Sequence, residues 1–313
     1  MRWNTLKARS GILAGAVTNR AGGREHALRL LAFRLARRVT PFVAVDAGDL
    51  RYVVSTDDTA GAGIAAFVHG DFEADTMRRT VAALAEHAGI DSLRGRNVLE
   101  VGANIGTETV SLVVRHGAAR VVAFEPDVSN VSLLRANVEL NGLREFVEVH
   151  HLALSDTDGT LELELSDDNW GDHRIRVERP SGPSVVGEDR RATASVATRR
   201  LDTLVASGEI DLHAIDVVWM DVQGHEGHVL AGAERLLESD IPVMTEYWPY
   251  GLRRAGGLDR FHALVARSFS LAVDLRPSPG APPRVLPAAD LAGLAEAYAT
   301  DAFAEHTNVL LVP

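Results

Sequence analysis

The chain contains no cysteine and a single lysine, Lys7, among its 313 residues. Without cysteine there are no disulfides, no thiolate nucleophile and no cysteine-ligated zinc. Without lysine beyond residue 7, a lysine base in the body of the protein is excluded as well. No apolar run approaches the roughly twenty residues that a membrane-spanning helix needs. The start also lacks the apolar segment and small-residue cleavage site of a secretory signal. We therefore expect a cytoplasmic protein with no membrane span.

Aromatic residues are scarce at 5%, whereas hydrophobic residues make up 46% and charged residues 24% of the chain, as in ordinary globular proteins. The net charge of −11 is unevenly spread, because residues 1–40 hold nine basic residues and one acid, Glu25. The acidic remainder is a poor partner for nucleic acid. From Glu25 to Val39 a moderately amphipathic helical pattern could pack on its own domain, on an anionic membrane surface or on a second subunit, which would make a homodimer.

The sequence pattern divides the chain into an N-terminal part and a longer part in which strands alternate with helices. A helical pattern covers Asp75–Ala88, and from Asn97 onward strands alternate with helices, which predicts a doubly wound, largely parallel sheet. We therefore expect an N-terminal extension over residues 1–75 and an α/β domain over residues 76–313. Within the extension, three β-rich runs separated by Asp and Gly predict a small antiparallel meander: Pro41–Val45, Arg51–Val54 and Ile64–Val68.

The most informative segment is the apolar strand Asn97–Val101, which runs into a glycine turn and then a helix. Gly102 and Gly106 remove Cβ where the backbone must bend or approach a ligand. A dinucleotide fingerprint, G-x-G-x-x-G, would need glycine where Asn104 stands, so a pyrophosphate ligand is disfavoured. Glu100, at the carboxyl end of the strand, suits a cationic or hydroxyl-bearing ligand group.

Later strand ends carry acids as well. Glu125 ends the second strand about twenty residues beyond the glycine turn, the spacing at which a carboxylate binds ribose hydroxyls. A third strand, Val147–Leu154, ends in small and apolar residues that could flank an adenine ring. Asp221 and Glu246 end two further strands. Because the carboxyl ends of strands share one crevice in an open α/β sheet, we expect these acids to lie close together.

These motifs, in this order, resemble the FkbM family of S-adenosylmethionine-dependent methyltransferases. The resemblance implies a class I methyltransferase fold, a Rossmann-like sheet of seven mostly parallel strands. It also implies methyl transfer, in most characterised members to a hydroxyl of a sugar, polyketide or other natural product. Gln223 and Trp219 depart from the family pattern, which usually has an acid and commonly a lysine there, and suggest an altered pocket. The matching motifs are Glu100–Gly106, Ala123–Pro126, Ala153–Asp156, Leu201–Leu204, Asp221–Glu226 and Glu246.

The resemblance and the residue chemistry together give the expected site. An acceptor alcohol must lose its proton, and we expect His225 or Asp221 to assist while Glu226 and Glu246 orient the base. Aromatic and histidine side chains in polar loops are the expected substrate wall: Trp170, His173, Trp248 and Tyr250. The expected S-adenosylmethionine contacts are Glu100, Gly102, Asn104, Gly106, Thr107, Glu125, Pro126, Leu152, Ala153, Leu154 and Asp221.

Several alternatives stay open at this point. No metal is assigned, although the acids and histidines could hold a divalent cation. The acceptor atom could belong to an amine or a carboxylate of a small molecule or peptide. A nicotinamide-dependent oxidoreductase and a cofactor-binding protein without turnover are the remaining rivals. The residues that could hold a cation are Asp221, His225, Glu226, His228 and Glu246.

Overall fold

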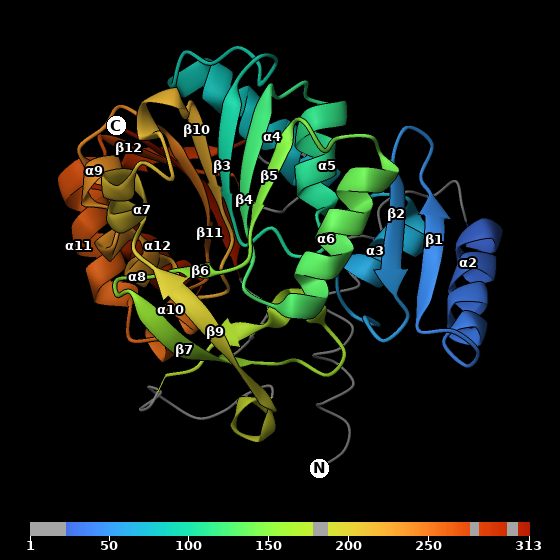
Figure 1. Cartoon of the computed structure of the whole chain (residues 1–313). Helices are drawn as coiled ribbons and strands as arrows, with labels where there is room; N and C mark the ends of the chain where they lie inside the picture. The colour runs from blue at the N-terminus through green and yellow to red at the C-terminus, as the bar shows by residue number, and fades with distance from the viewer. Residues whose placement is uncertain (1–22, 178–186, 276–281, 299–305) are drawn as a thin grey trace.

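A computed structural model describes residues 23–177, 187–275, 282–298 and 306–313, and its centre is an eight-stranded sheet (Figure 1). The strand order is β13-β12-β14-β11-β10-β3-β4-β5. The bounds are β3 Asn97–Val101, β4 Arg120–Phe124, β5 Val147–His150, β10 Val217–Met220, β11 Val243–Tyr247, β12 Leu271–Asp274, β13 Arg284–Pro287 and β14 Thr307–Val312.

The strand directions confirm the expected class of sheet. β5, β4, β3, β10 and β11 pair in parallel, and β14 inserts antiparallel between β11 and β12. The expected seven strands are therefore present, and β13 adds an eighth at the edge of the sheet by pairing antiparallel with β12. Only four residues long and flanked by prolines, this edge strand gives little alternating pattern in the sequence.

Helices cover both faces of the sheet, as Figure 1 shows. Because both faces are buried, the central strands are apolar throughout rather than alternating. Val98 and Trp219 lie in the core cluster shared with α4, α5 and α6, whereas Leu99 and Val218 lie in the cluster shared with α7, α8, α9 and α11. The bounds are α4 Ala74–His87, α5 Thr107–Val114, α6 Val128–Leu140, α7 Leu201–Ser207, α8 Glu226–Ala231, α9 Glu234–Leu237, α10 Pro249–Arg254, α11 Leu258–Ser268 and α12 Leu294–Ala297.

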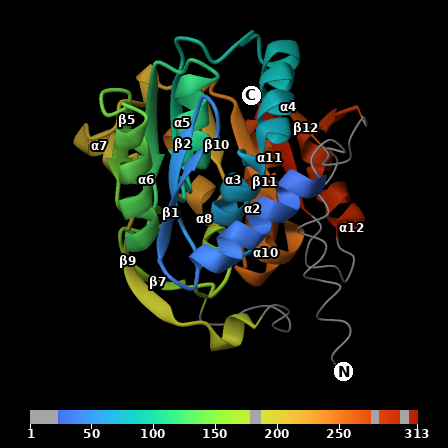
Figure 2. The same ribbon diagram turned by 90° about the vertical axis from the view of Figure 1, so that its right-hand side faces the viewer.

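The N-terminal extension differs from the predicted meander. It consists of α2 Gly23–Ala36, the hairpin β1 Phe42–Asp46 and β2 Arg51–Ser55, and α3 Ala62–His69. The prediction of a third strand over Ile64–Val68 is wrong, because this run lies inside α3. Ala62 and Ala66, one helical turn apart, are both buried there. A short apolar run does not distinguish a strand from a buried helix by periodicity. In Figure 2, α2 lies across the front of the molecule.

The extension packs directly on the α/β domain. Its buried residues belong to the same core cluster as α5 and α6. The side chain of Asn137 in α6 accepts a hydrogen bond from Val53 N of β2 at 2.6 Å and donates one to Ile105 O of the glycine turn at 2.8 Å. Tyr52 donates its hydroxyl to Thr107 O at 3.2 Å. A domain boundary near residue 75 stays a prediction.

A second sheet, of four strands, is formed by the part of the chain between β5 and β10. Its order is β6-β9-β7-β8. The expected strand Val147–Leu154 is split between the two sheets, because β5 ends at His150. The bounds are β6 Ala153–Leu154, β7 Gly159–Glu164, β8 Arg174–Ile175 and β9 Thr193–Arg199, with short 3-10 turns η1 Trp170–Asp172, η2 Glu188–Arg190, η3 Leu212–Ala214 and η4 Ala288–Gly293.

Helices α8 and α9 are separated by a break at Gly232. A Cβ on Gly232 would lie 2.0 Å from Ser155 O, so this break lets α8 lie close to the chain that follows β6. Within the described ranges, every helix is too short or too polar to cross a membrane.

Candidate active site

A half-open cleft lies where β3, β4 and β10 end, between the main sheet and the small sheet. The cleft contains about 540 Å³ of empty space, part of which is continuous with open solvent. The lining residues are Val101, Gly102, Asn104, Phe124, Glu125, Pro126, Asn130, Leu152, Ala153, Leu154, Leu163, Trp170, Gly171, His173, Ile175, Asp221, Val222, Gln223 and His225.

The glycine turn sits at one side of this cleft. Gly102 has a φ of 92°, in the left-handed region that favours glycine. A Cβ at this position would lie 1.8 Å from Asp221 O, so glycine here lets the ends of β3 and β10 approach each other. Asn104 follows with a φ of 51°, which asparagine tolerates better than most residues. The turn is therefore shaped by its contact with β10 as well as by any ligand.

Glu125 lines the cleft beside this turn. Its carboxylate accepts backbone N–H groups of Asn104 and Asp127, both at 2.8 Å. Burial raises the pKa of Glu125 to about 7, although these two hydrogen bonds oppose the shift. Asn104 Oδ1 and Asn130 Oδ1 are buried nearby without a hydrogen-bond partner in the described part of the chain. Acceptor atoms with spare capacity on this wall fit a ligand that brings hydroxyl or amino donors.

The neighbouring wall is apolar. Leu152, Ala153 and Leu154 line it together with Leu163 and Ile175 of the small sheet. A flat apolar slot beside a carboxylate is the arrangement that an adenosine requires, with the ring between side chains and the ribose on the acid. The apolar wall and the Glu125 carboxylate therefore fit S-adenosylmethionine, and the binding roles of the individual residues stay predictions.

Glu100, Gly106 and Thr107 were expected at the cofactor but lie behind the wall of the cleft. The Glu100 side chain is only 1% exposed, and its Oε2 accepts a hydrogen bond from Thr109 Oγ1 at 2.6 Å. Its Oε1 has no hydrogen-bond partner among the residues described. Burial raises the pKa of Glu100 to about 8, with the charge of Glu125 contributing, while the Thr109 hydrogen bond lowers it. A cofactor role for these three residues stays a prediction.

This burial gives a first testable result. A carboxyl whose pKa is raised in the folded state binds its proton more tightly there than in the unfolded state. The protonated carboxyl therefore stabilises the fold at low pH, and this stabilisation is lost as the pH rises from the unfolded-state pKa through the folded-state pKa. We expect Glu100→Gln, which mimics the protonated acid, to raise the free energy of unfolding by about 3 kcal/mol at about pH 8.5 and by less than about 1 kcal/mol at about pH 5. Urea unfolding at both pH values measures this, with the exposed Glu145→Gln as control. An equal effect at both pH values would contradict the explanation.

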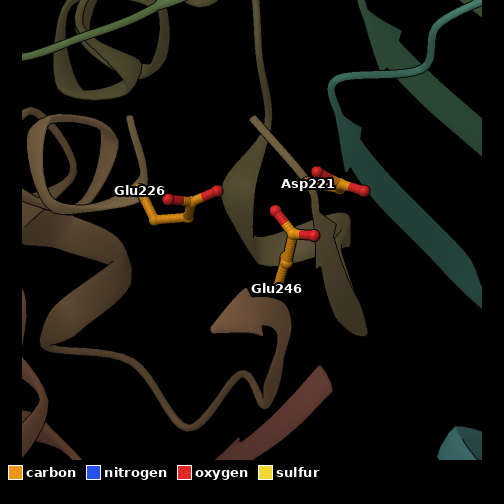
Figure 3. Close-up of side chains that lie close together, drawn as sticks. All are labelled: Asp221, Glu226 and Glu246. Carbon is orange, nitrogen blue, oxygen red and sulfur yellow. The ribbon is translucent and has the colours of Figure 1, made fainter. Parts of the chain in front are cut away.

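Three carboxylates gather beside the cleft, and one of them, Asp221, lines it (Figure 3). Asp221 follows β10, Glu226 begins α8 and Glu246 lies in β11, and oxygens of the three lie within 4.8 Å of one another. We call this set the carboxylate cluster. Such a spacing admits a cation in principle, but the side-chain amide of Gln223 already donates to Asp221 Oδ1 at 2.7 Å and to Glu246 Oε2 at 3.2 Å. The expected meeting of acidic strand ends is confirmed for Asp221 and Glu246.

Burial shifts the whole carboxylate cluster towards its protonated form. It raises the pKa of Asp221 and raises that of Glu226 to about 7. The pKa of Glu246 is raised well above its ordinary value, by burial and then by the charges of Asp221 and Glu226. Glu226 Oε1 accepts the backbone N–H groups of Val222 and Gly224, so this residue also fixes the turn that carries Asp221.

His225 faces a different environment. Its Nε2 lies 2.9 Å from Ser155 Oγ, and its ring stacks on His228 at 4.5 Å. Burial, followed by the charge of His228, lowers the pKa of His225 to about 3. The imidazole is therefore neutral near pH 7. His228 lies 3.3 Å from Asp156 and 3.0 Å from Ala255 O, so neither histidine contributes to the carboxylate cluster.

The expected substrate residues separate into two groups. Trp170 and His173 line the cleft. Trp248, 4% exposed, packs against Gly251 and beneath the Arg174 guanidinium, 4.4 Å from the ring centroid. Tyr250 donates its hydroxyl to Glu188 at 2.7 Å. These last two lie behind a smaller second cleft that is lined by Glu164, Arg174, Ile175, Val177, Gln223, Gly224, His225, Gly251, Arg254 and Ala255.

Some residues at the site were not singled out from the sequence. Asn130 lies two residues into α6, where it reads as an ordinary helical residue, and only its place beside the Asp127 cap brings it to the cleft. Leu163 and Ile175 reach the cleft because the small sheet folds over it. Trp219, a departure from the family pattern, is buried in the core on the α4–α5–α6 face. Gln223, the other departure, is at the centre of the site.

The chain is similar to known methyltransferases. Residues 100–256 match the model of the methyltransferase FkbM domain. The 2-O-methyltransferase NoeI of Sinorhizobium fredii is 30% identical over 56% of this chain and 73% of its own length, and the methyltransferase sdnD of Sordaria araneosa is 28% identical over 50% and 68%. A crystal structure of methyltransferase FkbM from Methylobacillus flagellatus aligns at 16% identity and a TM-score of 0.41, covering 69% of this chain and 43% of that one.

Proposed function

We propose that this chain, which belongs to the FkbM family of methyltransferases, methylates a hydroxyl of a sugar, polyketide or related natural-product acceptor. The protein is a methyltransferase whose donor is S-adenosylmethionine. The observation that carries the proposal is a cleft that is lined by Glu125 and an apolar wall and also by Asp221, a member of the carboxylate cluster. NoeI, whose name describes transfer to a 2-hydroxyl, supports an oxygen acceptor.

In this proposal the cleft residues hold the cofactor by its adenosine. Glu125 accepts the ribose hydroxyls, and Leu152 to Leu154 flank the adenine. Gly102, Asn104 and Pro126 complete the wall beside the ribose. When bound, S-adenosylmethionine supplies a methyl group on a cationic sulfonium. The acidic end of the cleft, where Asp221 lines the wall, favours that positive charge.

The proton of the acceptor is assigned to Asp221. In the transfer, the new oxygen–carbon bond forms as the sulfur–carbon bond breaks, and the hydroxyl proton goes to the Asp221 carboxylate. Because its pKa is raised by burial, Asp221 is a stronger base than an exposed aspartate. His225, with a pKa of about 3, is a poor proton acceptor, so in this proposal it holds the turn through Ser155. Glu226 and Glu246 orient Asp221.

The acceptor itself would enter between the aromatic side chains and the carboxylate cluster. Trp170 and His173 form the wall that it contacts, while Trp248 and Tyr250 support the small sheet from behind. Positioning an alcohol against the methyl group and excluding water accounts for several kcal/mol of barrier lowering in reactions of this kind. A homodimer is also proposed, supported by the exposed Leu28, Leu31 and Leu35 on α2.

Isotope transfer tests the function directly. The purified full chain is incubated with S-adenosylmethionine carrying a deuterated methyl group and with panels of methyl glycosides, polyketide alcohols, amines and carboxylic acids. We expect a mass gain of one deuterated methyl in alcohols only, located on oxygen by NMR. Calorimetry with S-adenosylhomocysteine and NAD runs in parallel. Transfer to amines or carboxylates alone, or binding of NAD without S-adenosylhomocysteine, would refute the proposal.

A further inference from the structure

Gln223 occupies the point where the two clefts meet. It lines both of them, together with Ile175 and His225. Its backbone has a φ of 53°, in the left-handed region, which among the described non-glycine residues is shared only by Glu73 and Asn104. A long side chain in this conformation costs of order 1 kcal/mol, and such strain persists only where the surroundings impose it. The strained position therefore invites a functional explanation.

The side chain of Gln223 bridges two acids. One amide nitrogen, Nε2, donates to Asp221 Oδ1 at 2.7 Å and to Glu246 Oε2 at 3.2 Å. Two buried carboxylates this close repel each other, and a shared N–H donor favours their charged forms. Because a glutamine amide carries no charge and does not titrate, it performs this role at every pH.

The other groups facing Asp221 act mostly against ionisation. Acids approach it from five other elements, namely the start of α4, α5, η1, α8 and β11. Among the described residues, His306, before β14, adds a favourable charge from outside the turn, and the backbone N–H of Gln223 adds a second hydrogen bond. The acids that interact with Asp221 are Glu73, Glu108, Asp172, Glu226 and Glu246. Gln223 is thus the main neutral donor that keeps this carboxylate ionised.

We propose that Gln223 is a positioning residue, whose amide holds Asp221 beside Glu246 and keeps the Asp221 carboxylate ionised and directed at the acceptor hydroxyl. The proposal rests on the proposed function for the identity of the proton acceptor. Its geometric part, the amide bridge between two carboxylates, is independent of which acceptor is methylated.

Two variants of Gln223 with side chains of similar size distinguish the effect of an added charge from the effect of losing the hydrogen-bond donor. Gln223→Glu puts a further acid against Asp221, and Gln223→Met keeps the length of the side chain but removes the donor. A base acts above its pKa, so raising the pKa of Asp221 moves the rising limb of the kcat–pH profile to higher pH. We expect a shift of about one pH unit or more in Gln223→Glu and a smaller one in Gln223→Met. Near neutral pH this lowers kcat about tenfold in Gln223→Glu, and the rate recovers as pH rises.

A second measurement needs no acceptor. Carbon-13 NMR of protein labelled in the aspartate carboxyls, with S-adenosylhomocysteine bound, follows the Asp221 signal, which is assigned by its absence in Asp221→Asn. We expect its titration midpoint to rise in both Gln223 variants. Gln223→Gly, which relieves the backbone strain but lacks the amide, is the matched control and should behave like Gln223→Met.

The outcomes discriminate clearly. Unshifted titration of Asp221 in Gln223→Glu and Gln223→Met would overturn the proposal, as would a rise in the KM for the acceptor with kcat and its pH profile unchanged. A Gln223→Gly variant identical to wild type would assign the effect to the backbone alone and would also overturn it. Failure of the proposed function appears differently, as wild-type protein that binds S-adenosylhomocysteine but methylates no alcohol, while the Asp221 titration still tests the amide bridge.

Discussion

Glu125→Ala is expected to weaken S-adenosylmethionine binding by about a thousandfold. Hydrogen bonds to a charged acceptor contribute about 1.5–3 kcal/mol each, and two ribose hydroxyls on one carboxylate therefore account for roughly 10²- to 10⁴-fold in affinity. The same carboxylate also fixes the backbone of Asn104 and Asp127, so its removal loosens the wall that the ribose contacts. Titration calorimetry with S-adenosylmethionine and S-adenosylhomocysteine measures the loss.

The controls for Glu125 separate binding from folding. Glu125→Gln keeps an acceptor oxygen and should lose less affinity than the alanine variant. Glu162→Ala changes an exposed acid on β7 and should leave affinity unchanged. Thermal unfolding of each variant verifies that the protein is folded under the binding conditions. An alanine variant that is folded and binds both ligands within about threefold of wild type would place the ribose elsewhere.

Asp221→Asn has the second large expected effect, on turnover rather than binding. Losing a general base costs about 10²- to 10⁴-fold in rate, and asparagine keeps the shape of the side chain. We expect kcat for alcohol methylation to fall by about a thousandfold, while affinity for S-adenosylhomocysteine changes little, since that product has no sulfonium charge. Single-turnover measurements with saturating donor report the chemical step.

The control for Asp221 is Asp240→Asn, at an exposed position between α9 and β11, which should leave kcat unaltered. Each assay is repeated with a chelator, because the carboxylate cluster has a spacing that admits a cation. If turnover disappears on chelation and returns with Mg²⁺, Asp221 acts as a metal ligand rather than as the general base. Asp221→Asn with full kcat would remove the residue from the mechanism altogether.

The sequence predicted the parts of the site that depend on local pattern. Strand–turn–helix periodicity located the glycine turn, and the spacing from it to Glu125 follows from the length of one βα unit. Parallel strands bring their carboxyl ends to one edge, which is why the proximity of Asp221 and Glu246 was predictable. Family resemblance supplied the chemistry. The positions of the glycine turn and of the strand ends follow from the order of the strands in the sheet.

The remaining features depend on contacts between segments that are distant in the chain. Ile64–Val68 was assigned to a strand because four or five apolar residues fit either period, and its burial in α3 decides for a helix. The lowered pKa of His225 arises from burial and then from the charge of His228, which the spacing of residues in the sequence does not reveal. The same holds for Gln223, whose bridge appears only when β10 and β11 lie side by side.

Asn137 links the N-terminal extension to the glycine turn, although the extension lies outside the segment that matches the family model. The family match begins at residue 100, yet one amide in α6 joins the strand at Val53 to the carbonyl of Ile105. A chain trimmed to the matched segment would leave that amide unsatisfied and uncover the apolar side of α6 that β2 now shields. The N-terminal hairpin therefore supports the glycine turn from outside the segment that the family model matches.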